Sequence, residues 1–160
     1  MTPVRKSLKR ASQMYDKILI PYDGSDEAQK GARHGVELAA ALDSAIHALY
    51  VIDLPGVPRA MALRDDEDEI RERYHEYGEE ALEEVASMAA EHGVDCSATI
   101  RTGSVSDEIV DYADEVGMDA VVMGSAYRGK LGNILGGTAD RVVRSATVPV
   151  ITQRMRVDEI

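Results

Sequence analysis

Residues 17–42 read KILIPYDGSDEAQKGARHGVELAAAL, and this stretch predicts one strand followed by one helix. The segment 17–22 is short and apolar, and the turn residues Asp23-Gly24-Ser25 end it, which is typical of a buried strand. From residue 26 to residue 42, small and apolar residues recur at nearly helical spacing, at Ala28, Ala32, Val36, Ala39 and Leu42. Because Gly31 and Gly35 lower the helix propensity of this segment, we expect the helix to pack closely against a sheet.

The same alternation of strand and helix continues along the chain. Further short apolar segments predict strands at 45–51, 96–101, 119–124 and 148–152. Helices are predicted at 65–92, after a cap formed by Ser104 with Asp107, and in a short segment that carries Val142, Val143 and Ala146. Five strands separated by helices predict an α/β fold with a doubly wound, Rossmann-like, five-stranded parallel sheet. We expect one domain over residues 14–155, a flexible arm at 1–13 and a tail at 156–160.

The composition argues against several classes of function. The chain has 160 residues and a formal net charge of −11, and so acidic a surface repels nucleic acid. No apolar run is long enough to span a membrane. The lone Cys96 excludes an intrachain disulfide and fits a reducing compartment, so we expect a cytoplasmic protein in which this residue is a small buried hydrophobe. The four histidines lack the spacing of a zinc site, and the acidic run 65–69 suits the positive end of a helix dipole better than a metal.

The segment after the fourth predicted strand is rich in glycine and leads into a helix. It reads GSAYRGKLGNILGGT from Gly124 to Thr138. A helix start offers unpaired N–H groups and a positive dipole end, so Gly137 and Thr138 are candidates for binding phosphate. The alternative is a flexible turn with Thr138 as a cap. The segment is also close to a P-loop, but Leu131 stands where a P-loop needs Ser or Thr for magnesium, which argues against a P-loop NTPase.

Asp23 ends the first predicted strand, at the edge where parallel sheets bind their ligands. Its carboxylate can accept a hydrogen bond from a sugar hydroxyl, or it can be the N-cap of the following helix, and both roles can hold together. The sequence shows no Ser/His/Asp order and no general base other than Asp23, so we predict no catalytic residues.

Five segments carry a likeness that extends over nearly the whole chain after residue 13. They are KILIPYDGS at 17–25, YVID at 50–53, VVMGS at 121–125, GT at 137–138 and VPV at 148–150. Together, in order and at normal spacing, they resemble the universal stress protein family. The resemblance implies the strand order 3-2-1-4-5 and a homodimer formed through the last strand.

The same resemblance implies a pocket for an adenine nucleotide, such as ATP with Mg²⁺. By position, its lining would comprise Pro21, Tyr22, Asp23, Val51, Met123, Gly124, Ser125, Gly129, Gly137 and Thr138. In nucleotide-binding members of this kind, Val51 and Met123 would enclose the adenine and Asp23 would hold the ribose. Amides of the glycine-rich loop would bind the phosphates.

The chain departs from the family's binding pattern at one position. Tyr127 stands where the pattern has a glycine, and Gly129, two residues later, is a candidate to replace it. We expect the tyrosine ring to narrow the phosphate site and ATP to bind weakly. Three hypotheses follow: an ATP-binding dimer that senses or regulates in the stress response, a dimerisation and interaction module of the same fold without nucleotide, and a slow ATP hydrolase.

Overall fold

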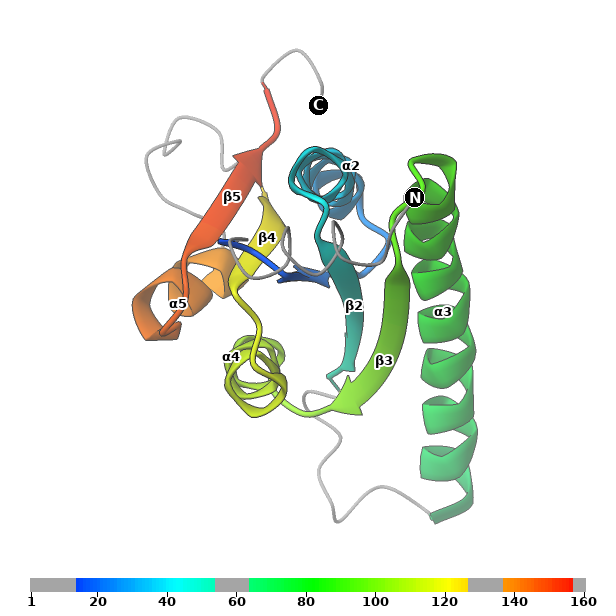
Figure 1. Ribbon diagram of the computed structural model, residues 1–160. Coiled ribbons are helices and arrows are strands. Elements are labelled where there is room, and N and C mark those ends of the chain that lie inside the picture. The colour runs from blue at the N-terminus through cyan, green and yellow to red at the C-terminus, as the bar shows by residue number, and fades with distance from the viewer. Residues whose placement is uncertain (1–13, 54–63, 127–136, 157–160) are drawn as a thin grey trace.

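The computed structural model describes residues 14–53, 64–126 and 137–156, with the backbone alone for residues 64–67. In these residues, five parallel strands form one sheet in the order β3-β2-β1-β4-β5 (Figure 1). The elements follow one another as β1 (Lys17–Pro21), α2 (Asp26–Leu42), β2 (Ala45–Ile52), α3 (Arg64–Glu91), β3 (Cys96–Thr102), α4 (Val105–Val116), β4 (Ala120–Ser125), α5 (Gly137–Ser145) and β5 (Val150–Arg154). The doubly wound α/β fold and the implied strand order are confirmed. The predicted arm at 1–13 and nearly all of the tail at 156–160 lie outside the described residues.

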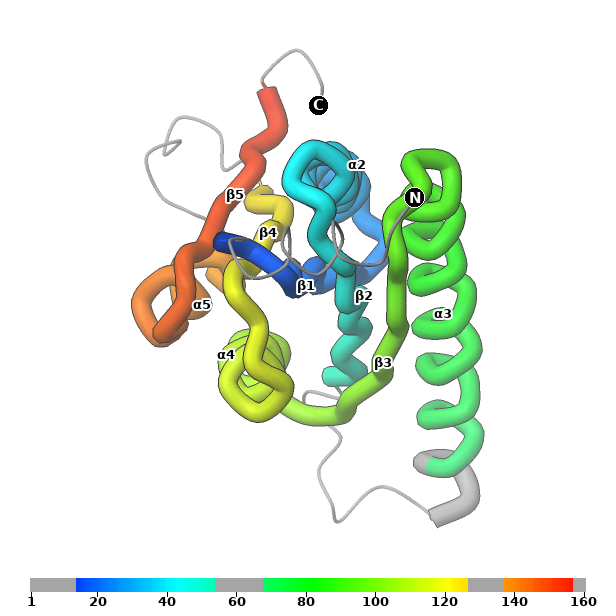
Figure 2. The backbone as a smooth tube through the Cα atoms, viewed as in Figure 1, coloured from blue at the N-terminus to red at the C-terminus, as the bar shows by residue number. Residues whose placement is uncertain are grey.

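The helices cover both faces of the sheet, with α2 and α3 on one side and α4 and α5 on the other (Figure 2). Ile18 and Ile20 of β1 pack into the core under α2 and α3, whereas Leu19 packs into the core under α4 and α5. Successive side chains of a strand point to opposite faces, so β1 contributes to both cores. All three side chains are fully buried, which explains why β1 is a continuous apolar run rather than an alternating one.

Two glycines bring α2 close to the sheet, which confirms the prediction of close packing. A Cβ atom on Gly31 would lie 2.7 Å from the carbonyl carbon of Met123 and 3.0 Å from the Cα atom of Gly124, both in β4. A Cβ atom on Gly35 would lie 2.6 Å from Cδ1 of Ile20 in β1. The contact at Gly31 joins backbone to backbone. The first turns of α2 therefore lie directly against the end of β4.

Three details at the ends of the elements differ from the predictions. Strand β5 begins at Val150, two residues after the predicted start at residue 148, because Pro149 has no N–H to donate to a neighbouring strand. The carbonyl of Pro149 still accepts a hydrogen bond from the N–H of Val121 at 2.9 Å. Ser104 is the N-cap of α4, but its side chain makes no capping hydrogen bond, so the predicted cap is wrong in its chemistry. Cys96 begins β3, as predicted, but it is only half-buried, where a small buried hydrophobe was expected.

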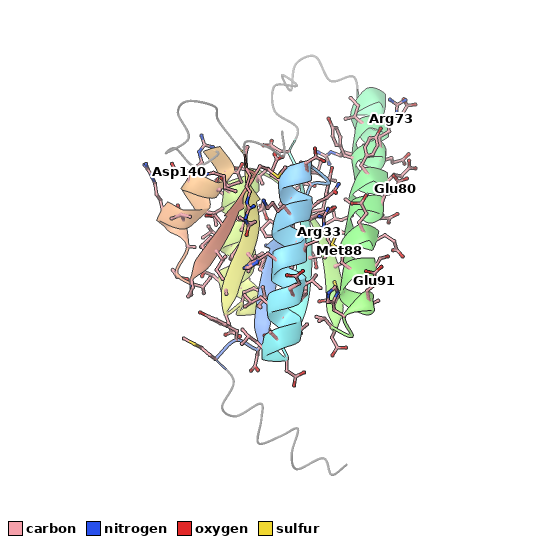
Figure 3. All side chains as sticks on the ribbon, turned by 90° about the horizontal axis from the view of Figure 1, so that it is seen from above. Arg33, Arg73, Glu80, Met88, Glu91 and Asp140 are labelled. Carbon is pink, nitrogen blue, oxygen red and sulfur yellow. The ribbon has the colours of Figure 1, made fainter. Side chains whose placement is uncertain are left out.

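Helix α3 is the longest helix of the described residues and carries many acidic side chains on its outer surface. Glu80 and Glu91 project from it into solvent, whereas Met88 lies on the side that faces α2 and packs against the core (Figure 3). The acidic run 65–69 falls within this helix, as expected, but only Asp68 and Glu69 have described side chains. Within the described residues, no helix combines the length and the apolar character that crossing a membrane requires.

Candidate functional site

A cavity of about 400 Å³ opens where β1, β2 and β4 end at the carboxyl edge of the sheet. The first residues of α2, α4 and α5 also line it, so the N-termini of these helices converge on one space. Every site residue predicted from the sequence lines this cavity except Gly129, which lies outside the described residues, as does Tyr127. The residues brought together are Pro21, Tyr22, Asp23, Val51, Met123, Gly124, Ser125, Gly137 and Thr138.

Asp23 orients the start of α2 without capping it. Its Oδ1 atom accepts hydrogen bonds from the backbone N–H of Ser25 at 2.9 Å and from the hydroxyl of Ser25 at 2.6 Å. Ser25 is the N-cap, and its Oγ atom accepts from the N–H of Ala28 at 3.2 Å. The predicted N-cap role of Asp23 is therefore wrong, because the chain turns at Gly24, with φ +83°, and Asp23 lies two residues before the N-cap. Asp23 is exposed, and its Oδ2 atom accepts no hydrogen bond from the described residues, so this oxygen is available to a ligand.

Tyr22 borders the cavity, but its side chain is engaged elsewhere. The ring belongs to the core under α2 and α3, and the hydroxyl donates a hydrogen bond to the carboxylate of Glu84 in α3. Burial, reinforced by this hydrogen bond, raises the pKa of Tyr22 well above its ordinary value. The hydroxyl is therefore engaged by Glu84 and is not free for a ligand.

The deeper walls of the cavity are aliphatic. Val51 from β2 and Met123 from β4 line it together with Leu49 and Ile109. Leu49, Met123 and Ile109 are almost fully buried and belong to the core under α4 and α5, so this wall is held in place by packing. Aliphatic walls with a few polar groups at the rim are suited to a flat, weakly polar ring such as a purine.

Gly124 is needed for helix–strand packing whether or not a ligand is bound. A Cβ atom there would lie 2.9 Å from the backbone nitrogen of Ala28, and it would overlap the carbonyl group of Glu27. Only glycine lets the end of β4 approach the first turn of α2 this closely. The resemblance implies that Gly124 contacts the ligand, whereas the structure shows that the packing of β4 against α2 already requires a glycine there.

Sequence reasoning missed several polar residues of the cavity, notably Ser25, Glu27 and Arg141. Arg141 follows Gly137 by four residues, so the two share one face of α5, and that spacing could have revealed it. Glu27 lies in the first turn of α2, where an acidic residue is ordinary for a helix start. No local pattern distinguishes it from Asp26.

A second polar cluster lies under α4, apart from the cavity. The hydroxyl of Tyr112 is hydrogen-bonded to Nδ1 of His47 at 3.0 Å, and the guanidinium of Arg101 lies 4.8 Å from the centre of the Tyr112 ring. Burial, with a smaller contribution from the charge of Lys17, lowers the pKa of His47. In the parts of the chain that the structure describes, no three His, Cys, Asp or Glu side chains are grouped so that they could hold a metal ion.

Comparison with known proteins agrees with this fold over nearly the whole chain. Residues 14–154 match the sequence model of the Universal stress protein family. Universal stress protein MJ0531 of Methanocaldococcus jannaschii is 34% identical over 148 residues, which cover 90% of this chain and 85% of that protein. The solved structure of MJ0577, from the same organism, has a TM-score of 0.72 at 25% identity and covers 90% of this chain and 99% of its own. A universal stress protein family protein from Arabidopsis thaliana, solved with AMP bound, has a TM-score of 0.67 at 24% identity, covering 89% and 94%.

Proposed function

The chain belongs to the universal stress protein family, and from this we propose that it is a homodimeric ATP-binding protein with a sensing or regulatory role in the stress response. The observation that carries the proposal is the cavity, because it gathers residues from β1, β2, β4 and α5 that are far apart in the sequence. The binding of AMP by the Arabidopsis relative supports an adenine nucleotide as the ligand.

Each part of the nucleotide has a matching part of the cavity. The aliphatic side chains of Val51 and Met123 suit the two faces of the adenine ring. The Oδ2 atom of Asp23, left unused by Ser25, suits a ribose hydroxyl as a charge-assisted acceptor. The first amides of α5, at Gly137 and Thr138, suit phosphate, and Mg²⁺ would accompany ATP as its counterion.

Dimerisation through β5 is proposed because β5 is an edge strand. It pairs with β4 on one side, and within the described residues no strand pairs with its other side. An open aliphatic edge is an aggregation hazard, and symmetric pairing with a second copy removes it. Light scattering at micromolar concentration is expected to give twice the mass of one chain. A monomer at that concentration would contradict this part of the proposal.

The second candidate function is an interaction module of the same fold that holds no nucleotide. It is favoured by Tyr127, which stands where the resemblance places a glycine of the phosphate loop. ATP hydrolysis is not proposed, because the sequence offers no candidate base other than Asp23, and the Oδ2 atom that Ser25 leaves free is assigned to the ribose. We place the protein in the cytoplasm, where the thiol of Cys96 stays reduced.

The test is to release and identify any nucleotide carried by the purified protein, and then to titrate ATP into ligand-free protein by calorimetry. Val51→Glu puts a charge into the adenine wall and is expected to abolish binding. Val143→Glu is the matched control, because Val143 is an exposed valine of α5 that does not line the cavity. Absence of ATP binding by the unmodified protein favours the interaction module, and equal binding by both variants refutes the placement of adenine.

A further inference from the structure

Arg141 of α5 is the cavity residue that the proposed function leaves unexplained. It is the one positively charged side chain among the described residues that line the cavity, and it is exposed. Within the described part of the chain, no acidic side chain pairs with it. Its neighbour Arg144, by contrast, forms an ion pair with Asp140 at 3.3 Å and does not line the cavity.

The helix geometry directs Arg141 toward the start of α5. Residues four apart lie on the same face of a helix, and helical side chains lean toward the N-terminus. Arg141 therefore shares a face of α5 with Gly137, one turn earlier, and both residues line the cavity. A mobile cation and the positive end of a helix dipole then act on the same part of the cavity.

The opposite wall of the cavity has the opposite charge. Asp23 follows β1 and Glu27 lies in the first turn of α2, and both line the cavity. Because α2 and α5 cover opposite faces of the sheet, the cavity has an acidic side at α2 and a basic side at α5. A ligand with a neutral, hydroxyl-bearing end and an anionic end fits this arrangement in one orientation, with its anionic end toward α5.

Building on the proposed function, we infer that Arg141 makes the site select for phosphorylated nucleotides over nucleosides by binding the phosphate chain of the ligand. The selectivity is electrostatic. It therefore grows with the number of phosphate groups and weakens as salt screens the exposed guanidinium. The aliphatic walls, which contact the base, contribute equally to the binding of adenosine and of ATP.

The experiment compares Arg141→Gln, Arg141→Lys and the control Arg144→Gln by calorimetry with ATP, adenosine and inorganic tripolyphosphate. We expect Arg141→Gln to weaken ATP and tripolyphosphate binding about tenfold, or about 1.4 kcal/mol. Adenosine affinity should change less than about twofold, and the salt dependence of ATP binding should flatten. Arg141→Lys should retain most of the affinity, and Arg144→Gln all of it.

Each result separates the inference from the proposed function. Unchanged ATP and tripolyphosphate binding in Arg141→Gln overturns the inference while leaving ATP binding intact. An equal loss of affinity for adenosine and for ATP in Arg141→Gln also overturns the inference, because such a loss means that Arg141 acts through packing. Binding of tripolyphosphate through Arg141, with no binding of ATP or adenosine, overturns the inferred nucleotide selectivity and the proposed function, and leaves only a phosphate contact at Arg141. No binding of any of the three probes overturns both.

Discussion

Replacing Gly31 with alanine is expected to lower the free energy of unfolding by about 2 kcal/mol. Alanine raises the helix propensity of α2 by about 1 kcal/mol. The new Cβ atom, however, would lie 2.7 Å from the carbonyl carbon of Met123 and closer still to the backbone nitrogen of Gly124. Overpacking costs about 1–3 kcal/mol, and backbone atoms cannot rotate away, so the cost lies near the upper limit. For a chain of this length, a loss of about 2 kcal/mol in the free energy of unfolding lowers the melting temperature by about 4–8 °C.

Gly35→Ala is the matched control, because it makes the same substitution one turn later in the same helix. Its new Cβ atom would meet Cδ1 of Ile20 at 2.6 Å, which is the end of a side chain that can shift. The helix propensity gained should roughly offset this cost, so stability should change by less than about 1 kcal/mol. Urea unfolding followed by circular dichroism measures both variants. If Gly31→Ala proves as stable as Gly35→Ala, the backbones of α2 and β4 lie far enough apart at Gly31 to accommodate a Cβ atom, and the reasoning is wrong.

Three further predictions concern the ends of β1 and β4. Asp23→Asn is expected to weaken ATP binding by about 1.5–3 kcal/mol. The fold should stay intact, because an amide oxygen still accepts the hydrogen bonds from Ser25. Unchanged affinity in calorimetry would mean that Asp23 only orients α2. Because the pKa of Tyr22 is raised in the folded protein, the unfolded chain loses its Tyr22 proton at a lower pH than the folded chain does. The stabilisation from Tyr22 is therefore complete below pH 10 and is lost as the pH rises above it. Tyr22→Phe removes this ionisation, so the variant is expected to lose less stability above pH 10 than the unmodified protein. Melting curves from pH 8 to pH 11 measure this, and parallel pH profiles for the two proteins would count against it. Tyr127→Gly is expected from the sequence to tighten ATP binding about tenfold, or about 1.4 kcal/mol, under identical salt. Equal, tight binding by both proteins would show that Gly129 already replaces the missing glycine.

The order of the elements could be predicted because local patterns carry it, whereas most residues of the candidate site came from the resemblance to a family. The apolar run of β1 and the turn after it needed no knowledge of the rest of the chain. Gly31 and Gly35 indicated close helix–sheet packing because glycine inside a helix is costly without such a reason. The strand order is different in kind, since it rested on the resemblance to a family and not on any pattern of residues.

The parts that could not be predicted depend on contacts between distant residues or on one backbone angle. Tyr22 and Glu84 are 62 positions apart, and nothing in either segment indicates that the hydroxyl is engaged. Asp23 and Ser25 are both good N-cap residues, and only the left-handed turn at Gly24 decides between them. The separation of charge in the cavity, with Glu27 on α2 and Arg141 on α5, likewise depends on where the fold places the two helices.

The position of β1 at the centre of the sheet has a consequence for synthesis of the chain. Of the strands that the structure describes, β1 leaves the ribosome first, and β4, which covers one of its edges, begins at Ala120, 100 residues after Ile20. At about 5–20 residues per second, that edge stays open for about 5–20 s in every nascent chain. Its exposed groups belong to Ile18, Leu19 and Ile20, an apolar segment able to pair with the same segment of a neighbouring chain on a polysome. The strand whose last four residues are buried in the folded protein is thus open to pairing with other chains while the protein is being made.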